Sequence, residues 1–139
     1  MDEVFFEQFV DRFQAAWDRR EGEAFRNLWD PAGRLYYPPL GGWIPGSRIG
    51  ELNDLNKAVL PDLTWKAESW AGRGARLFVQ MRSTATINGR RLEWTGVDHF
   101  TFRDGLIVEE IAYLDTHAFW EAIDPAMQRG ALLRLDREV

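Results

Sequence analysis

The sequence contains no cysteine among its 139 residues. Disulfide bonds, thiolate nucleophiles and cysteine-ligated metal sites are therefore excluded, and the chain carries no disulfide signature of export. Histidine is scarce as well, since only His99 and His117 are present. Because these two histidines have neither the HxH nor the HExxH spacing of common metal sites, we predict no bound metal.

Long apolar runs and clusters of basic residues are also missing. No apolar stretch approaches the roughly 20 residues that span a bilayer, and the first residues, 1–3, are acidic where a signal peptide is basic. We therefore expect a cytoplasmic protein with no membrane partner. The net charge is −5, and the basic residues cluster only as pairs at 19–20 and 90–91. This charge distribution argues against a nucleic-acid partner.

Aromatic residues are abundant, with seven Trp, nine Phe and three Tyr making up 14% of the chain. Each aromatic ring buries roughly 150–250 Å². A well-filled core is the plain interpretation, and walls around a cavity for a planar or apolar ligand are the alternative. The length suits a single domain over residues 1–139.

The first part of the chain predicts helices. Apolar residues recur at helical spacing over 2–20, where Asp2 is the expected N-cap, and a short second helix follows with Ala24, Phe25, Leu28 and Trp29 on one side. Residues 30–33 predict a turn, 35–37 a short strand and 38–46 a loop.

Ser47 is the expected cap of a third helix that runs to about Leu60. Its inward face is predicted from helical spacing and consists of Ile49, Leu52, Leu55 and Val59.

The second half of the chain predicts strands, because the apolar period changes to two. Four strands are expected over 63–70, 75–87, 91–103 and 106–116. Asn88-Gly89 and Asp104-Gly105 are hairpin signals, which make the last three strands an antiparallel meander. Helices are expected again over 118–123 and from Asp124-Pro125 to about Arg137. Helices followed by strands predict an α+β fold, in which a long sheet curls around helices and leaves a concavity.

This order of elements resembles the cone-shaped fold of the nuclear-transport-factor-2-like (NTF2-like) superfamily. Residues 97–102 (VDHFTF) and 104–109 (DGLIVE) are similar to the paired last strands of ketosteroid isomerases and of SnoaL-like polyketide cyclases. Tyr113-Leu114-Asp115, and the segment with Phe119 and 121–124 after it, are similar to limonene epoxide hydrolases. The resemblance implies a strongly curved antiparallel sheet wrapped around N-terminal helices, a C-terminal helix, and a homodimer formed through the outer sheet face.

Asp98 is the first candidate for chemistry. Alternation along the strand 91–103 places it on one face with five apolar or glycine positions, namely Leu92, Trp94, Gly96, Phe100 and Phe102. Burial among such residues should raise the pKa of its carboxyl. The resemblance implies the role of the protonated aspartic acid of ketosteroid isomerase, which donates to an oxyanion. The alternative is an Asp that only accepts from a Trp N–H or a backbone amide.

The resemblance also shows which catalytic groups of these families are missing. The oxyanion-binding tyrosine of the isomerases falls at Phe13 and their aspartate base at Tyr37. A phenylalanine cannot donate a hydrogen bond, and a tyrosine, with a pKa near 10, is a poor base at neutral pH. The polyketide-cyclase base falls at Ala112. Glu110 shares the face of Ala112, and we interpret it as a solvated glutamate at the rim, with replacement of the missing base as the alternative.

The epoxide-hydrolase arginine falls at Arg82, but its two acids fall at Thr84 and Ala112. Its Tyr and Asn fall at Leu35 and Tyr37. Without its acids, Arg82 is interpreted as a surface or interface charge.

Two functions remain open on this sequence. The first is an enzyme for cofactor-independent isomerisation, cyclisation or dehydration of a hydrophobic carbonyl compound, with Asp98 as acid or base and Tyr37 assisting across the cavity. The second is a non-catalytic module that binds a hydrophobic ligand or assembles as a dimer. The candidate substrate-binding residues are Phe13, Trp17, Trp43, Trp65, Trp94, Phe100 and Glu110, with Trp29 as a further wall.

Two side-chain groups have more specific expected positions. Trp43 lies in the Gly/Pro-rich loop, so it is expected to act as a lid over a ligand or as a plug that closes the cone. Phe78, Ile111 and Tyr113 alternate to the outer sheet face together with His99. These residues make the outer face more apolar than a solvent-exposed sheet face should be, which favours dimerisation through that face.

Overall fold

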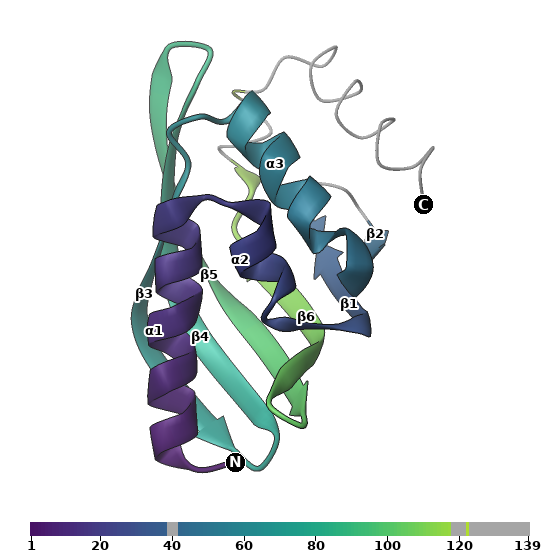
Figure 1. Ribbon diagram of the computed structural model, residues 1–139. Coiled ribbons are helices and arrows are strands. Elements are labelled where there is room, and N and C mark those ends of the chain that lie inside the picture. Colours follow the sequence, from purple (N-terminus) through teal and green to yellow (C-terminus); the bar gives the residue numbers. More distant parts are fainter. Residues whose placement is uncertain (39–41, 118–121, 123–139) are drawn as a thin grey trace.

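The computed structural model describes residues 1–38, 42–117 and 122, and the helices predicted after Thr116 fall almost wholly outside these residues. The helices lie together on one side of a curved sheet (Figure 1). The helical elements are α1 (Glu3–Arg19), α2 (Gly22–Arg26), the 3₁₀ turn η2 (Gly46–Arg48) and α3 (Ile49–Val59). The strands are β1 (Trp29–Tyr37), β2 (Gly42–Pro45), β3 (Thr64–Arg73), β4 (Arg76–Ile87), β5 (Arg90–Arg103) and β6 (Leu106–Leu114).

The six strands form one open sheet in the order β2-β1-β6-β5-β4-β3. Neighbouring strands are antiparallel except for β1 and β6, which run parallel. The predicted α+β class and the curved sheet are therefore confirmed, and the sheet is mostly antiparallel, with β1 and β6 as the parallel pair. The parallel pair matters for function because it places β1 beside the strand that carries Glu110.

The local signals for caps and hairpins are confirmed. The side chain of Asp2 accepts from the backbone N–H of Phe5 at 2.9 Å and so caps α1. Asn88 and Asp104 have φ values of 50° and 52°, and the glycines that follow them also have positive φ. Two consecutive left-handed residues are what a type I′ hairpin turn requires.

Several predictions about residues 24–47 are wrong. The second helix ends at Arg26, and Trp29 begins β1. The predicted turn at 30–33 lies inside β1, where the register shifts between Trp29 and Arg34, so the turn-type residues form a bulge rather than a chain reversal. Part of the predicted loop is the strand β2, which pairs with β1. Ser47 lies within η2 and the N-cap of α3 is Arg48.

The core is built from aromatic rings of α1 packed on β5. The centroid of the Phe9 ring lies 4.7 Å from the ring centroid of Phe102 and 5.0 Å from that of Phe100, and both pairs pack edge to face. This is the preferred geometry of aromatic pairs. Gly72 of β3 allows the ring of Phe6 to approach, since a Cβ at position 72 would lie 2.5 Å from it. The face of β5 predicted to be inward is buried apart from Gly96, which is half-buried.

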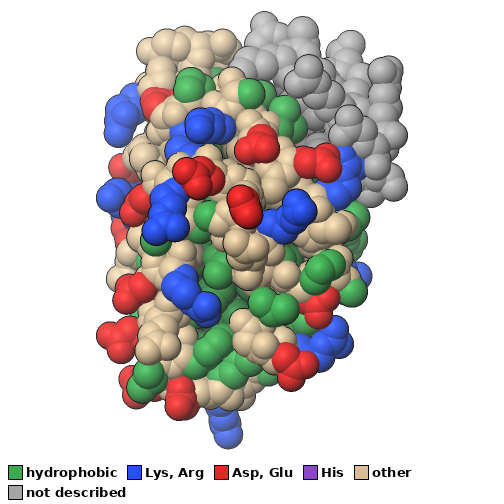
Figure 2. Space-filling model, in the orientation of Figure 1, with side chains coloured by type: hydrophobic (Ala, Val, Ile, Leu, Met, Phe, Trp, Pro, Cys, Tyr) green, Lys and Arg blue, Asp and Glu red, His purple; other side chains and the backbone are tan. Residues whose placement is uncertain are grey.

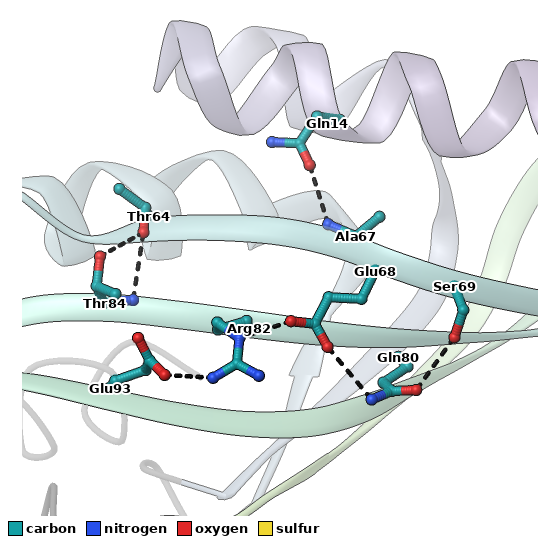
Figure 3. A network of polar contacts seen from close by, with 9 residues as sticks. All are labelled: Gln14, Thr64, Ala67, Glu68, Ser69, Gln80, Arg82, Thr84 and Glu93. Carbon is teal, nitrogen blue, oxygen red and sulfur yellow. Dashed lines mark hydrogen bonds and ion pairs between the residues drawn. The ribbon is translucent and has the colours of Figure 1, made fainter.

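A polar side chain of α1 ties this helix to the sheet. The Gln14 side chain accepts a hydrogen bond from the backbone N–H of Ala67 at 3.0 Å (Figure 3). It also donates to the carbonyl of Trp65 at 2.7 Å, and the two bonds anchor α1 on β3. Lys/Arg and Asp/Glu side chains are interspersed over the face shown in Figure 2. Within the residues that the structure describes, no helix is both long and apolar enough to cross a bilayer.

Candidate functional site

A cavity of about 70 Å³ lies between the three α-helices and the concave face of the sheet. This volume has room for about five water-sized groups, which is less than the 300–1,000 Å³ of typical pockets for drug-sized ligands. Its lining is mostly apolar, with a few polar groups. The lining residues are Phe13, Trp17, Phe25, Trp29, Leu35, Tyr37, Ile49, Leu52, Asn53, Asn56, Leu63, Trp65, Met81, Ser83, Trp94, Asp98, Glu110, Ala112 and Leu114.

Asp98 lies on β5 at the sheet side of this cavity. Its side chain is 3% exposed, and its carboxylate oxygen Oδ2 accepts a hydrogen bond from Nε1 of Trp65 at 2.8 Å. Burial raises the pKa of Asp98 to about 7, although the Trp65 bond works in the opposite direction because it favours the charged form. The predicted burial is thus confirmed, and so is the alternative partner, a Trp N–H. Near neutral pH, Asp98 can both accept and release a proton.

Glu110 is a second buried acid, and its interpretation as a solvated rim residue is wrong. It lies on β6, is 6% exposed and lines the cavity. Burial raises the pKa of its carboxyl well above the ordinary value, and the nearby charge of Asp98 raises it further. Burial thus favours the protonated form of both acids, and because the charge of one opposes ionisation of the other, they titrate as a coupled pair.

Tyr37 completes the polar part of the sheet wall. Its neighbour Tyr36 pairs with Ile111 of β6, which sets Tyr37 beside Ala112, the register partner of Asp98. Burial raises the pKa of Tyr37 to about 12, the carboxylates of Asp98 and Glu110 act in the same direction, and the Asn56 side chain opposes them. Tyr37 therefore remains a phenol and can donate a hydrogen bond to an oxygen in the cavity.

Most of the predicted site residues line the cavity. These are Phe13, Trp17, Trp29, Tyr37, Trp65, Trp94, Asp98 and Glu110. Trp17 stacks nearly parallel on Trp65, with 6.4 Å between ring centroids and 11° between planes. Trp17 thus packs against the indole ring of Trp65, whose N–H donates to the Asp98 carboxylate.

Two predicted site residues lie elsewhere. Phe100 is fully buried and packs between Phe9 and Phe13, so it belongs to the core. Trp43 is 40% exposed on β2, where the Arg34 guanidinium lies 3.9 Å from its ring. Trp43 is not among the lining residues, and this position gives no support to its interpretation as a lid or plug.

Three polar lining residues were missed from the sequence: Asn53, Asn56 and Ser83. A signal for the asparagines was present, because Asn53 follows Ile49 and Asn56 follows Leu52 at a spacing of four. The predicted inward face of α3 is confirmed, since Ile49 and Leu52 are buried and Leu55 and Val59 pack half-buried against the core. The buried Asn53 is the addition to this face. Ser83 alternates with the buried Met81, and it is itself buried.

Arg82 projects away from the cavity. Its guanidinium forms ion pairs with Glu68 and Glu93 on the outer face, in the network drawn in Figure 3. Thr84 shares this outer face and bonds Thr64 at 2.7 Å. The interpretation of Arg82 as a surface charge is confirmed. Among residues 1–38, 42–117 and 122, no three His, Asp or Glu side chains come together as a set of metal ligands.

The family comparison agrees with the fold. The model of the SnoaL-like domain matches residues 10–110 of this chain. No curated protein matches the sequence at a significant level.

Solved structures similar to this one share the fold at low sequence identity. An NTF2-like protein of unknown function from Burkholderia pseudomallei has a TM-score of 0.77 and 21% identity, over 88% of this chain and 98% of that one. IdmH from Streptomyces antibioticus, for which a polyketide-cyclase function has been suggested, has a TM-score of 0.71 and 18% identity over 89% and 97%. A protein with a ketosteroid-isomerase-like fold from Catenulispora acidiphila has a TM-score of 0.69 and 15% identity over 75% and 82%.

Proposed function

The chain belongs to the SnoaL-like domain family of NTF2-like proteins, and we propose that its cavity carries out cofactor-independent acid/base chemistry on a small hydrophobic carbonyl compound. The observation that carries this proposal is the pair of buried acids, Asp98 and Glu110, on one wall of an otherwise mostly apolar cavity. When their surroundings give two acids different pKa values, one site can supply both a base and an acid at neutral pH.

In the proposed step, ionised Asp98 removes a proton from the carbon next to the substrate carbonyl. The electron pair of that C–H bond moves to the carbonyl oxygen, and the resulting enolate accepts hydrogen bonds from Tyr37 and from protonated Glu110. The indole N–H of Trp65 holds Oδ2 of Asp98, so Oδ1 takes the proton. A pKa near 7 suits this role, because the base is partly free at neutral pH and still basic enough to accept a proton.

The three reactions expected from the sequence share this enolate. Return of the proton to a different carbon gives isomerisation, attack of the enolate carbon on a second carbonyl gives cyclisation, and loss of a β-hydroxide gives dehydration. The cavity volume of about 70 Å³ limits the substrate to about a single small ring or a short chain in this conformation.

That same small volume favours a second candidate, a non-catalytic module that binds a small hydrophobic ligand. Indole rings of Trp17, Trp65 and Trp94 occupy much of the space that a larger substrate would need. In either case we propose a homodimer through the outer sheet face, where Phe78 is 46% and Tyr113 57% exposed.

Hydrogen exchange of a simple ketone tests the catalytic proposal. The α-protons of cyclohexanone in D₂O are followed by ¹H NMR with the wild-type protein, with Asp98→Asn, and with Asp104→Asn as the matched control in an exposed hairpin turn. We expect Asp98→Asn to slow catalysed exchange by about 10²-fold or more and Asp104→Asn to leave it unchanged. Full exchange by a folded Asp98→Asn protein would refute the role of Asp98, and binding of cyclohexanone without any catalysed exchange would favour the binding module.

A further inference from the structure

Three N–H groups at the cavity have no hydrogen-bond partner among the described residues. They are Nε1 of Trp17, Nε1 of Trp29 and Nδ2 of Asn53, and all three residues line the cavity. Buried donors are nearly always paired with protein, ligand or water, because an unpaired one loses its hydration without compensation. The acid/base step proposed above uses Asp98, Tyr37, Glu110 and the N–H of Trp65, and it leaves these three donors without a function.

Asn53 is the most informative of the three donors. It projects from α3, is 5% exposed, and belongs to the buried face of that helix together with Ile49 and Leu52. An amide in an apolar helix face is costly unless both its oxygen and its nitrogen are satisfied. A leucine would fill the same space without that cost, so the unpaired Nδ2 calls for an acceptor that enters the cavity.

The charges of the cavity define that acceptor. Among the lining residues that the structure describes there is no Lys, Arg or His, and these residues do include the two acids Asp98 and Glu110. An anionic ligand would add a further negative charge beside Asp98 without a cation from these residues to offset it. A neutral oxygen, such as an ether, hydroxyl or second carbonyl, accepts from the amide without this repulsion.

We propose that Asn53 donates a hydrogen bond to a second, neutral oxygen of the substrate and thereby sets which ring compounds the site accepts. This inference rests on the proposed function, because it takes the reacting carbonyl to lie at Asp98 and Tyr37. The substrate is then a small neutral ring or chain that carries an acceptor oxygen in addition to the reacting carbonyl. Asn53 acts as a specificity residue and takes no part in the proton transfer.

Matched ketones test the inference. Cyclohexanone, tetrahydropyran-4-one and tetrahydropyran-3-one have the same ring size and one carbonyl, but the last two replace a CH₂ group with an oxygen at two different positions. Binding of each is titrated by protein-observed NMR with the wild-type protein, with Asn53→Leu, and with Asp54→Asn as a control at the next, exposed position of α3. We expect Asn53→Leu to weaken at least one pyranone about tenfold relative to cyclohexanone, and Asp54→Asn to preserve the wild-type ratio.

If Asn53→Leu changes the affinity for all three ketones equally, or changes none of them, the inference is overturned. Asn53 would then only bind water or fill space. If Asn53→Leu does not fold, Asn53→Ala provides the same comparison of ratios. The exchange of α-protons is read in the same samples, so the two proposals fail separately. If Asn53→Leu loses the preference for a pyranone but the wild-type protein catalyses no exchange, the proposed function alone is overturned. If the wild-type protein catalyses exchange but shows no preference that depends on Asn53, the role of Asn53 alone is overturned.

Discussion

Asp98 and Glu110 lie on the same face of neighbouring strands, because Glu110 is two residues along β6 from Ala112, the register partner of Asp98. Diagonal neighbours of this kind are roughly 7–8 Å apart between Cα atoms, and closer between side chains. At this separation in a buried site, ionisation of one carboxyl opposes ionisation of the other. The charge of Asp98 accordingly raises the pKa of Glu110, so the two groups titrate as a pair.

Replacement of Asp98 by Asn should change how stability depends on pH. The folded-state pKa of Asp98 is raised from 3.8 to about 7, so the folded protein binds a proton that the unfolded chain has released. The stability linked to this group is therefore greatest below about pH 4 and is lost as the pH rises to about 7. The shift corresponds to roughly 4 kcal/mol at most. We expect urea unfolding at pH 4 to 8 to show a smaller loss of stability over this range in Asp98→Asn, and parallel pH profiles of the two proteins would contradict the assignment.

Replacement of Trp65 by Phe removes the N–H that donates to Oδ2 of Asp98 at 2.8 Å. Because this bond lowers the pKa of Asp98, its loss should raise that pKa further and cost about 1–3 kcal/mol of stability for the unpaired carboxyl. The ¹³C chemical shift of the Asp98 carboxyl, titrated by NMR, measures the change. Trp17→Phe is the matched control, since Nε1 of Trp17 has no partner among the described residues. An equal pKa in both variants would show that the Trp65 bond does not tune Asp98.

Replacement of Glu110 by Gln should stabilise the protein above about pH 5. The pKa of Glu110 is raised well above 4.5 in the folded state, so the folded protein holds a proton that the unfolded chain releases. The stability linked to this group is therefore greatest below about pH 4 and is lost as the pH rises from there towards the folded pKa. A glutamine has the same shape and never ionises. We expect equal free energies of unfolding for the variant and wild type near pH 4 and a more stable variant near pH 8. Glu7→Gln, at an exposed position of α1, is the control that should show no such divergence.

Substitution of Gly72 by Ala should displace the Phe6 ring, since the added Cβ would lie 2.5 Å from it. Overpacking of this kind costs about 1–3 kcal/mol, which thermal or urea unfolding measures. Combining Gly72→Ala with Phe6→Leu removes the clash, so the cost of the alanine should be smaller in that background. Strict additivity of the two changes would show that the glycine is not needed for the Phe6 contact.

Charge on the outer sheet face should abolish the proposed dimer. Phe78 and Tyr113 are the exposed aromatic residues there, and the Phe78 ring stacks on His99 at 4.3 Å. We expect sedimentation velocity to give a dimer for the wild-type protein and a monomer for Phe78→Asp. Val4→Asp adds the same charge at another exposed apolar position, on α1, and should leave the dimer intact. A monomeric wild-type protein would refute the interface.

Much of the fold could be predicted because its signals are local. The hairpins at Asn88 and Asp104 depend on two residues each, and the burial of Asp98 depends on alternation within one strand. Those predictions are confirmed. Residues 30–33 were misassigned because Trp29 and Arg34, on either side of them, both pair with β6 and hold them as a bulge within β1 despite their turn composition.

The sequence by itself determined that a strand with apolar alternation would bury one acid, because alternation is a property of that strand alone. Only the tertiary structure decided that Glu110 is buried beside Asp98. Alternation assigns Glu110 to a face of β6, but its burial also depends on the parallel strand β1, which lies beside β6 and pairs Leu35 with Glu110. The same holds for Asn53, whose inward position was decided by how α3 rotates as it packs over the cavity. Contacts between segments far apart in the chain set both outcomes, and periodicity within one segment does not contain them.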